Sequence, residues 1–108
     1  MTEKIKVIYC PKQMRPFPAH VDNAMQFMVN GLIETVKVAD DTAIVCCKDA
    51  KENGMPCNIS VPVDGFYGDV FMVGLAGDEF VSLSETQVAF YLPQAMKRYK
   101  EHSSGGNA

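Results

Sequence analysis

The stretch that decides the fold is Gly68-Asp69-Val70-Phe71-Met72-Val73-Gly74-Leu75-Ala76-Gly77-Asp78-Glu79-Phe80-Val81-Ser82-Leu83-Ser84-Glu85. Two apolar runs, residues 70–75 and 79–83, flank a short link in which Gly77 can adopt the positive φ of a tight turn. The two runs therefore predict a β-hairpin. Directly after it, Ser84 and Gln87 match the S-x-x-Q capping box, which predicts the start of a helix.

The predicted helix carries one apolar stripe and one proline. The stripe consists of Val88, Tyr91, Leu92, Ala95, Met96 and Tyr99. This spacing is typical of a helix that packs one side on a core. Pro93 lacks a backbone donor, so we expect a kink near it or two helical pieces that meet there. Residues 103–108 are rich in Ser and Gly and are expected to form a flexible tail.

Upstream of the hairpin, the chain alternates between strand patterns and breakers. Residues 4–10 predict a first strand, and the three prolines in residues 11–18 predict an extended connector or an edge segment. Asp22 as an N-cap and Asn30-Gly31 as a C-cap predict a short helix between them. Residues 32–38 and 42–48 predict a second hairpin, with the nearly all-apolar second strand in the centre of a sheet.

Residues 49–64 have the least regular pattern, with turn or breaker pairs at Asn53-Gly54 and Met55-Pro56. Residues 59–63 could form only a short edge strand, because Pro62 lies among them. We therefore expect an α+β fold with a mostly antiparallel sheet of about five strands, in the order β-α-β-β-β-β-α, and with two helices packed on one face. A single domain is expected over residues 1–102, with residues 103–108 as its tail.

Composition and charge narrow the possible functions. A net charge of −3 gives no basic face for nucleic acid, so direct DNA binding is not expected. No apolar run is long enough to cross a bilayer and no signal peptide pattern opens the sequence, so we expect a cytoplasmic protein without a membrane partner. The four cysteines form no CxxC pair and no histidine stands at zinc-ligand spacing, which predicts free thiols and no metal site.

The sequence shows no catalytic constellation, so we expect no catalytic residues, no cofactor and no enzyme activity. A nucleophile needs a base within reach, and only His20 and His102 are available. Cys57 is the one cysteine in an irregular segment. The acidic pairs Asp40-Asp41 and Asp78-Glu79 fall in predicted hairpin turns, where Asp is favoured for backbone reasons. No glycine-rich phosphate loop is present.

A binding role is easier to support, because aromatic, Asn and Arg residues gather in the irregular segments. Aromatic rings with Arg and Asn can stack a base and read its edge, and they can equally form a protein-binding hot spot. For each residue alone, ordinary packing or solvation is the competing explanation. The candidate ligand-binding residues are Tyr9, Arg15, Phe17, Asn53, Gly54, Asn58, Tyr67, Asp69 and Arg98. In this hypothesis the rings stack, the backbone amides of Asn53-Gly54 donate, and Arg15 or Arg98 holds a phosphate.

Asn53-Gly54-Met55-Pro56-Cys57-Asn58 is similar to a G-L-P-x-N loop, residues 67–74 to an I-x-G-T-x-x-I-V-G motif, and residues 78–84 to a D-F-x-S-L-T motif. With these motifs the sequence resembles the DUF3846 family of small proteins from bacteriophages and other mobile elements. Asp22-Asn23 and residues 31–34 also match. The sequence departs from the family at Ile59, where a basic residue is expected, and at Pro93.

The resemblance implies a context rather than an activity. It suggests a phage or mobile-element accessory protein in a bacterial cytoplasm that counters host defence. The leading hypothesis is a non-enzymatic homo-oligomer that binds and sequesters a nucleotide-derived signalling molecule. The alternative is a protein–protein inhibitor of a host defence effector or nuclease, with an exposed apolar patch near Phe17 or Phe66. A third hypothesis, an enzyme that degrades such a signal, predicts sensitivity to substitution of Cys57 or His20.

Overall fold

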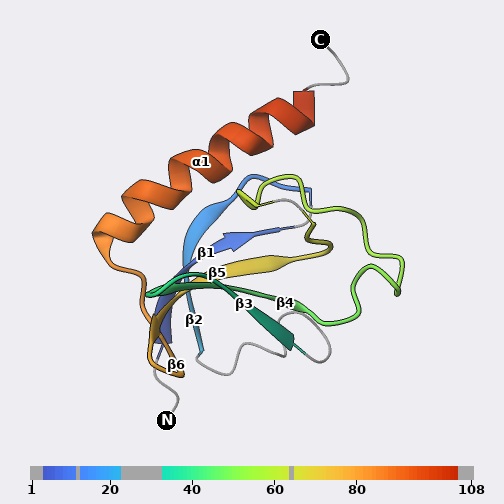
Figure 1. The fold of residues 1–108 in the computed structure, drawn as a ribbon. Helices are drawn as coiled ribbons and strands as arrows, with labels where there is room; N and C mark the ends of the chain where they lie inside the picture. Colours follow the sequence, from blue (N-terminus) through green and yellow to red (C-terminus); the bar gives the residue numbers. More distant parts are fainter. Residues whose placement is uncertain (1–3, 12, 23–32, 64, 105–108) are drawn as a thin grey trace.

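The structure, a computed structural model, describes residues 4–11, 13–22, 33–63 and 65–104. Its elements are β1 (Lys4–Cys10), β2 (Phe17–Asp22), β3 (Ile33–Ala39), β4 (Thr42–Cys47), β5 (Val70–Ala76), β6 (Glu79–Val81) and α1 (Glu85–Ser104). The six strands form one antiparallel sheet in the order β2-β1-β5-β4-β3, and β6 pairs with β5. The helix α1 crosses over one face of this sheet (Figure 1). The α+β class and the antiparallel sheet agree with the prediction.

β5, which lies within residues 68–85, forms the centre of the sheet. β5 pairs with β4 along one edge; along its other edge, β1 pairs with the first half of β5 and β6 with the second half. The turn between β5 and β6 contains Gly77 at a φ of 64°, as predicted. Gly74 lies where the chain returns, and a Cβ there would be 2.7 Å from the backbone oxygen of Ser82. Glycine at position 74 therefore permits the close approach of these two segments.

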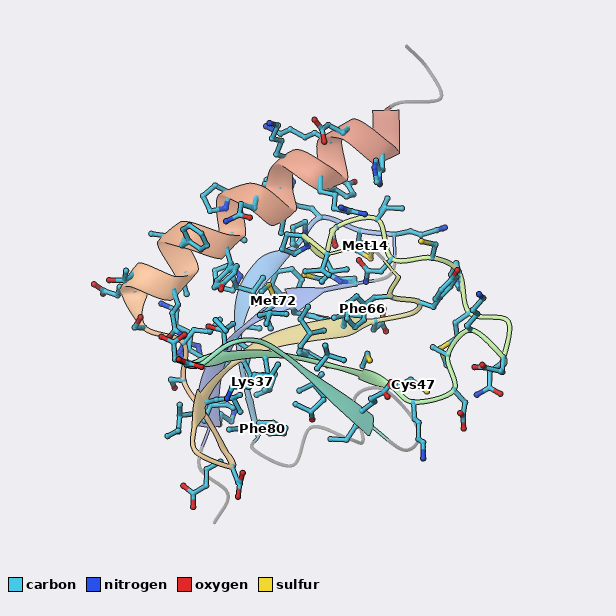
Figure 2. The ribbon with its side chains drawn as sticks, in the orientation of Figure 1. Met14, Lys37, Cys47, Phe66, Met72 and Phe80 are labelled. Carbon is cyan, nitrogen blue, oxygen red and sulfur yellow. The ribbon has the colours of Figure 1, made fainter. Side chains whose placement is uncertain are left out.

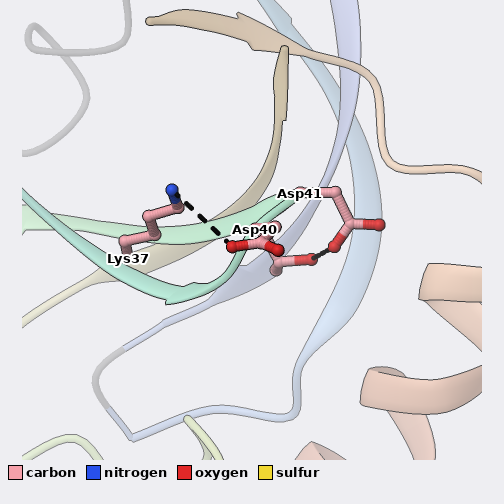
Figure 3. Close-up of polar contacts among 4 residues, drawn as sticks. Lys37, Asp40 and Asp41 are labelled. Carbon is pink, nitrogen blue, oxygen red and sulfur yellow. Dashed lines mark hydrogen bonds and ion pairs between the residues drawn. The ribbon is translucent and has the colours of Figure 1, made fainter. Parts of the chain in front are cut away.

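The second predicted hairpin is also present, since β3 and β4 pair around Asp40-Asp41. β4 lies between β5 and β3, and all six of its residues are buried, which confirms its central position. In the turn, the Thr42 hydroxyl donates to Asp41 Oδ1 at 3.0 Å, and Lys37 Nζ lies 3.9 Å from Asp40 Oδ1 (Figure 3). The Lys37–Asp40 pair is exposed, and such pairs contribute little to stability.

The segment that follows β1 departs in part from the prediction. β2, antiparallel to β1, extends from Phe17 to Asp22, so the expected helix N-cap is the last residue of a strand. β2 is an edge strand, which is where a sheet tolerates a proline such as Pro18. The helix expected between residues 22 and 31 falls mainly on residues 23–32, which lie outside the described residues. Residues 59–63 form bends, so they do not form the short edge strand that their sequence allows.

The described residues contain one helix, and not the two expected on one face. α1 starts with the predicted capping box: the Gln87 amide donates to Ser84 Oγ at 3.1 Å, and the Ser84 amide donates to Gln87 Oε1 at 2.7 Å. Pro93 lies inside α1 without dividing it, so the prediction of two helical pieces was wrong. The Gln94 side chain donates to the carbonyl of Phe90 at 2.8 Å, in the turn just before the proline. The helix extends to Ser104, past the start of the expected tail at residue 103.

The sheet buries apolar side chains on both faces. On the face that α1 covers, called the helix face, the buried residues are Ile8, Cys10, Ile44, Cys46, Val61, Val70, Met72, Leu83 and Ala95. On the opposite face they are Ile5, Val7, Val21, Ala43, Val45, Cys47, Ala50, Phe71 and Val73. Met72 and Phe66 lie toward the helix and Phe80 on the other side (Figure 2). No described helix has the length and apolar character needed to cross a membrane.

Candidate functional site

The long segment between β4 and β5 folds back on itself beside the sheet. Cys57 and Tyr67 form an isolated antiparallel bridge, the Asn58 amide donates to the Phe66 carbonyl at 2.8 Å, and the Gly68 amide donates to the Pro56 carbonyl at 2.8 Å. Residues 53–58 and 65–69 are therefore held together. The segment has a fixed shape that can form one wall of a site.

Asn58 is the residue that fixes this shape. Its side-chain amide donates to the carbonyls of Cys10 at 2.8 Å and Gly68 at 2.7 Å. Its Oδ1 accepts from the Ser60 amide at 2.9 Å, the Ser60 hydroxyl at 3.2 Å and the Val61 amide at 2.9 Å. The residue is only 2% exposed. These five bonds tie the loop to β1 and to the start of β5, so any ligand contact by this side chain requires breaking them.

A groove of about 310 Å³ lies between this segment and the edge of the sheet. Its lining residues are Glu34, Val36, Cys46, Cys47, Lys48, Ala50, Lys51, Glu52, Gly65, Phe66 and Tyr67. Glu34 is opposite Cys46 on the neighbouring strand, and directly opposed residues share a face of the sheet. Since Cys46 belongs to the helix face, Glu34 and Cys46 lie on the helix-face side of the groove, while the lining residues Cys47, Ala50 and Tyr67 pack with the core of the opposite face.

The groove combines aromatic rings with charges of both signs. Phe66 and Tyr67 supply the rings, and Lys51 Nζ lies 5.8 Å from the centroid of the Tyr67 ring, within cation–π range. Lys48 and Lys51 supply positive charge, while Glu34 and Glu52 supply carboxylates. This set of groups can stack a flat ring, attract an anion and accept hydrogen bonds from a ligand.

The Cys46 thiol that lines the groove is not poised for chemistry. The Cys46 thiol lies 3.6 Å from the carbonyl oxygen of Glu34, to which it donates. Burial raises the pKa of Cys46 to about 11, with further contributions from Glu34 and Cys47. A thiol with so high a pKa is protonated at neutral pH and is a poor nucleophile. Cys57 is the exposed cysteine among the described residues, and its side chain faces the carbonyl of Asn58.

The structure separates the predicted site residues into several places. Tyr67 lines the groove, and Asn53 and Gly54 form an exposed turn in the same segment. The amides proposed to bind a ligand are already engaged: the Asn53 amide donates to Asp49 at 2.9 Å and the Gly54 amide to Lys51 at 3.1 Å. These two amides therefore stabilise the turn.

A second group of predicted residues, Tyr9 and Phe17, lies on the face of the sheet opposite α1. Tyr9 stacks on Phe71 with ring centroids 4.6 Å apart, and it meets Phe17 edge-on at 5.4 Å. Burial and a hydrogen bond to the negative Asp69 raise the pKa of Tyr9. β1, which carries Tyr9, is separated from β3 by β5 and β4, so this aromatic cluster does not join the groove. Arg15 is exposed in the connection between β1 and β2.

Arg98 lies in a different hollow, beneath α1. This hollow of about 280 Å³ is lined by Pro62, Gln94, Lys97, Arg98 and Glu101. It lies near the C-terminal half of the helix, where the backbone dipole is unfavourable for anions. Arg98 is thus on the helix and Arg15 on the β1–β2 connection, and neither lines the groove around Tyr67.

Sequence reasoning missed most of the groove. Lys51 lies in the irregular 49–64 segment, and Glu34 and Val36 lie in the predicted strand over residues 32–38, so no local pattern links them. Only the pairing of β3 with β4 and the return of residues 65–67 bring these residues together. Among the described residues, no group of three or more His, Cys, Asp or Glu side chains is arranged to hold a metal ion.

A family model covers nearly the whole of the described fold. The model of a family described as "Domain of unknown function (DUF3846)" matches residues 5–101. The chain belongs to this family. The match spans β1 through most of α1, so the DUF3846 domain includes both the groove and the Asn58 loop. No match was found among curated proteins or among solved structures.

Proposed function

We propose that this DUF3846 protein is a binding protein that holds a nucleotide-derived molecule in the groove between β3 and the 48–67 segment. The observation that carries the proposal is the combination of Tyr67, Phe66 and Lys51 on one wall of a groove. Stacking of a base on an aromatic side chain contributes about 1–3 kcal/mol. The lysines supply charge for a phosphate, and the carboxylates of Glu34 and Glu52 can accept from the amino groups of a base.

The size of the groove limits what one chain can hold. Ligand sites in proteins commonly occupy about 300–1,000 Å³, and this groove is about 310 Å³. It therefore suits a single nucleotide unit more than a large cofactor. Since Lys51 is exposed and rests near the Tyr67 ring, it can move onto a phosphate while the ring stays held by the Cys57 bridge.

The proposed role is sequestration without turnover. The buried, high-pKa thiol of Cys46 supports binding more than nucleophilic attack on a ligand at this site. In this proposal the protein is a phage or mobile-element accessory protein that acts in the bacterial cytoplasm and removes a nucleotide-derived defence signal. The supporting context is the resemblance of the chain to small mobile-element proteins.

Calorimetric titration with a panel of mononucleotides, linear and cyclic dinucleotides and cyclic NAD-derived molecules tests the proposal. We expect one class of ligand to bind. We expect Lys51→Gln to weaken that binding by about tenfold, the effect of removing one charge-assisted contact. Lys97→Gln is the matched control, because it removes an exposed lysine outside the groove. Absence of binding across the panel, or equal effects of the two substitutions, would contradict the proposal.

The contribution of stacking by the Tyr67 ring to ligand binding is tested separately, because Tyr67 also packs against the core of the opposite face. Tyr67→Phe retains the stacking surface and should bind normally. Tyr67→Leu removes the aromatic face while keeping an apolar side chain, and should weaken binding. A thermal melt of each variant establishes that the fold is retained. Equal affinity of the Leu and Phe variants would exclude stacking by this residue.

A second candidate, a protein–protein inhibitor of a defence effector, is favoured by one observation. Met14 in the connection between β1 and β2 is 65% exposed, and Phe17 at the start of β2 is 43% exposed. Exposed large apolar side chains are candidate anchors for a protein partner. The double substitution Met14→Ser and Phe17→Ser should then abolish inhibition of an effector while nucleotide binding stays unchanged. Retained inhibition by this variant would exclude the connection as the contact.

A further inference from the structure

The sheet has two free edges among the described strands, and they differ in their ability to accept another strand. β2 forms one edge and contains Pro18, which lacks the backbone donor that a further strand requires. β3 forms the other edge, and its sequence Ile33-Glu-Thr-Val-Lys-Val-Ala39 contains no proline. Residues 34–37 are exposed. A β-bulge between Lys37 and Ala39 interrupts the end of β3, so residues 33–37 are the part of this edge that remains regular for strand pairing.

The symmetry of a strand pairing determines what a second copy of β3 would bring. Two identical antiparallel strands are related by a two-fold axis perpendicular to the sheet, so the same face of each copy points the same way. Glu34 and Val36 line the groove from the helix face of β3. Pairing through β3 therefore places the grooves of both copies on one face of a continuous sheet, and they meet at the axis.

The side chains of β3 suit a pairing centred on Val36. On the groove face Val36 then faces Val36 of the second copy, and Glu34 faces the bulged segment at Val38. On the opposite face Thr35 faces Lys37. No like charges stand directly opposite each other, and the central pair is β-branched, which favours cross-strand packing. Val36 is 37% exposed in the single chain, so the pairing would bury an apolar side chain that is now half-exposed.

We propose that two copies of this chain pair antiparallel through β3 about Val36, joining their grooves into one site for a ligand with two nucleotide units. The ligand part of this inference rests on the proposed function. Each groove of about 310 Å³ suits one nucleotide unit, and the joined site offers two aromatic walls related by the two-fold axis. Such a site matches a ligand that is itself close to two-fold symmetric, such as a cyclic dinucleotide.

The pairing is expected to depend on concentration and on ligand. Stable protein interfaces bury about 1,200–2,000 Å² of accessible surface, and the pairing of two short strands buries less than that. A ligand that contacts both copies binds the dimer and not the monomer, so it shifts the equilibrium toward the dimer by mass action. A mononucleotide fits within one groove and has no such effect.

Sedimentation velocity tests the pairing directly, with cyclic di-AMP and AMP as the probes. We expect dimer to form with rising protein concentration and to increase with cyclic di-AMP but not with AMP. Val36→Asp places two carboxylates opposite each other and should weaken dimerisation by roughly tenfold or more. Val63→Asp is the matched control, since Val63 is 38% exposed and lies outside β3. A monomer at all concentrations, with or without cyclic di-AMP, would overturn the pairing.

Disulfide trapping tests the register. In a background of Cys57→Ser, which removes the exposed native thiol, Val36→Cys should give a covalent dimer on mild oxidation. Directly opposed residues have Cβ atoms about 4.5–5.5 Å apart, close to the spacing that a disulfide needs. Val63→Cys in the same background is the control. Absence of the V36C dimer, or equal cross-linking by V63C, would overturn the register about Val36.

Calorimetric stoichiometry separates this inference from the proposed function. One cyclic di-AMP per two chains supports the joined site. One cyclic di-AMP per chain, bound by a monomer, overturns the joined site and leaves the proposed function standing. If neither probe binds while dimer forms and Val36→Asp disrupts it, the strand pairing stands, and the joined nucleotide site is overturned together with the proposed function for these ligands.

Discussion

Replacement of Asn58 by alanine should destabilise the loop that forms one wall of the groove and lower the free energy of unfolding of the domain. The Asn58 side chain makes five hydrogen bonds to groups of Cys10, Ser60, Val61 and Gly68. Because the site is buried, the two carbonyls, two amides and one hydroxyl have no ready access to bulk water once the side chain is removed. The substitution thus removes the connection of the loop both to β1 and to the start of β5.

The size of this effect follows from the number of groups left without partners. A hydrogen bond contributes about 1 kcal/mol net, and a buried group left without a partner costs about 1–3 kcal/mol. Five lost bonds, partly offset by a water molecule that enters the space vacated by the side chain, give a loss of about 3–5 kcal/mol in the free energy of unfolding. This is a large part of the stability of a small domain, which is about 5–15 kcal/mol.

Urea denaturation followed by circular dichroism measures this loss as a shift of the midpoint at constant slope. Asn53→Ala is the matched control, because Asn53 is exposed in the same loop and should change stability by no more than about 0.5 kcal/mol. A loss below about 1 kcal/mol for Asn58→Ala would refute the reasoning, since it would mean that the buried partners are readily satisfied in another way.

Asn58→Asp adds a test that depends on pH. An ionised carboxylate would face the carbonyl oxygens of Cys10 and Gly68, which now accept from the Asn58 amide. The neutral form is favoured in the folded state, so the folded-state pKa of the new carboxyl is raised above its unfolded value. The stability of this variant should therefore be greatest at acidic pH and fall as pH rises through the folded-state pKa. A variant with no extra loss of stability toward neutral pH would contradict this.

Three further predictions concern the scaffold. Ser84→Ala removes the helix cap and should cost about 1 kcal/mol in urea denaturation, against little change for the exposed Thr86→Ala; equal effects would contradict the capping role. Gly74→Ala places a Cβ against the backbone oxygens of Val81 and Ser82 and should lower the free energy of unfolding by about 1–3 kcal/mol. An unchanged urea midpoint would show that β5 and residues 81–82 separate easily. The raised pKa of Tyr9 gives stability that is present below its unfolded pKa and is lost as pH rises through the folded value. Asp69→Asn should lower the pKa of Tyr9 in a phenolate absorbance titration, and no change would exclude the carboxylate as a cause.

Local signals in the sequence predicted the part of the fold built from neighbouring residues. The β5–β6 hairpin needs only two apolar runs and Gly77, and the start of α1 needs only Ser84 and Gln87. The central position of β4 followed from its nearly unbroken apolar run. In each case the deciding interactions lie within a few residues, where turn chemistry and capping are readable.

The rest depends on contacts between distant segments. The prolines of residues 11–18 predicted a connector or an edge segment, and β2 starts there as an edge strand; its continuation to Asp22 was missed, because Asp22 is also a favoured helix N-cap. Asn58 resembled a ligand-binding residue, since the sequence does not reveal that its partners include Cys10, 48 positions away. The groove joins Glu34 to Lys51 and Tyr67 through strand pairing and loop return. Its existence therefore could not be predicted from any one stretch.

The central claim is that the groove holds a nucleotide-derived molecule without changing it. The most direct measurement incubates the protein with the nucleotide that binds in the calorimetric panel, removes free nucleotide, denatures the protein by heat and identifies the released molecule by mass spectrometry. We predict stoichiometric release of the intact nucleotide, and a smaller amount released from Lys51→Gln than from Lys97→Gln. Release of a chemically altered product, or equal release from both variants, would contradict the account.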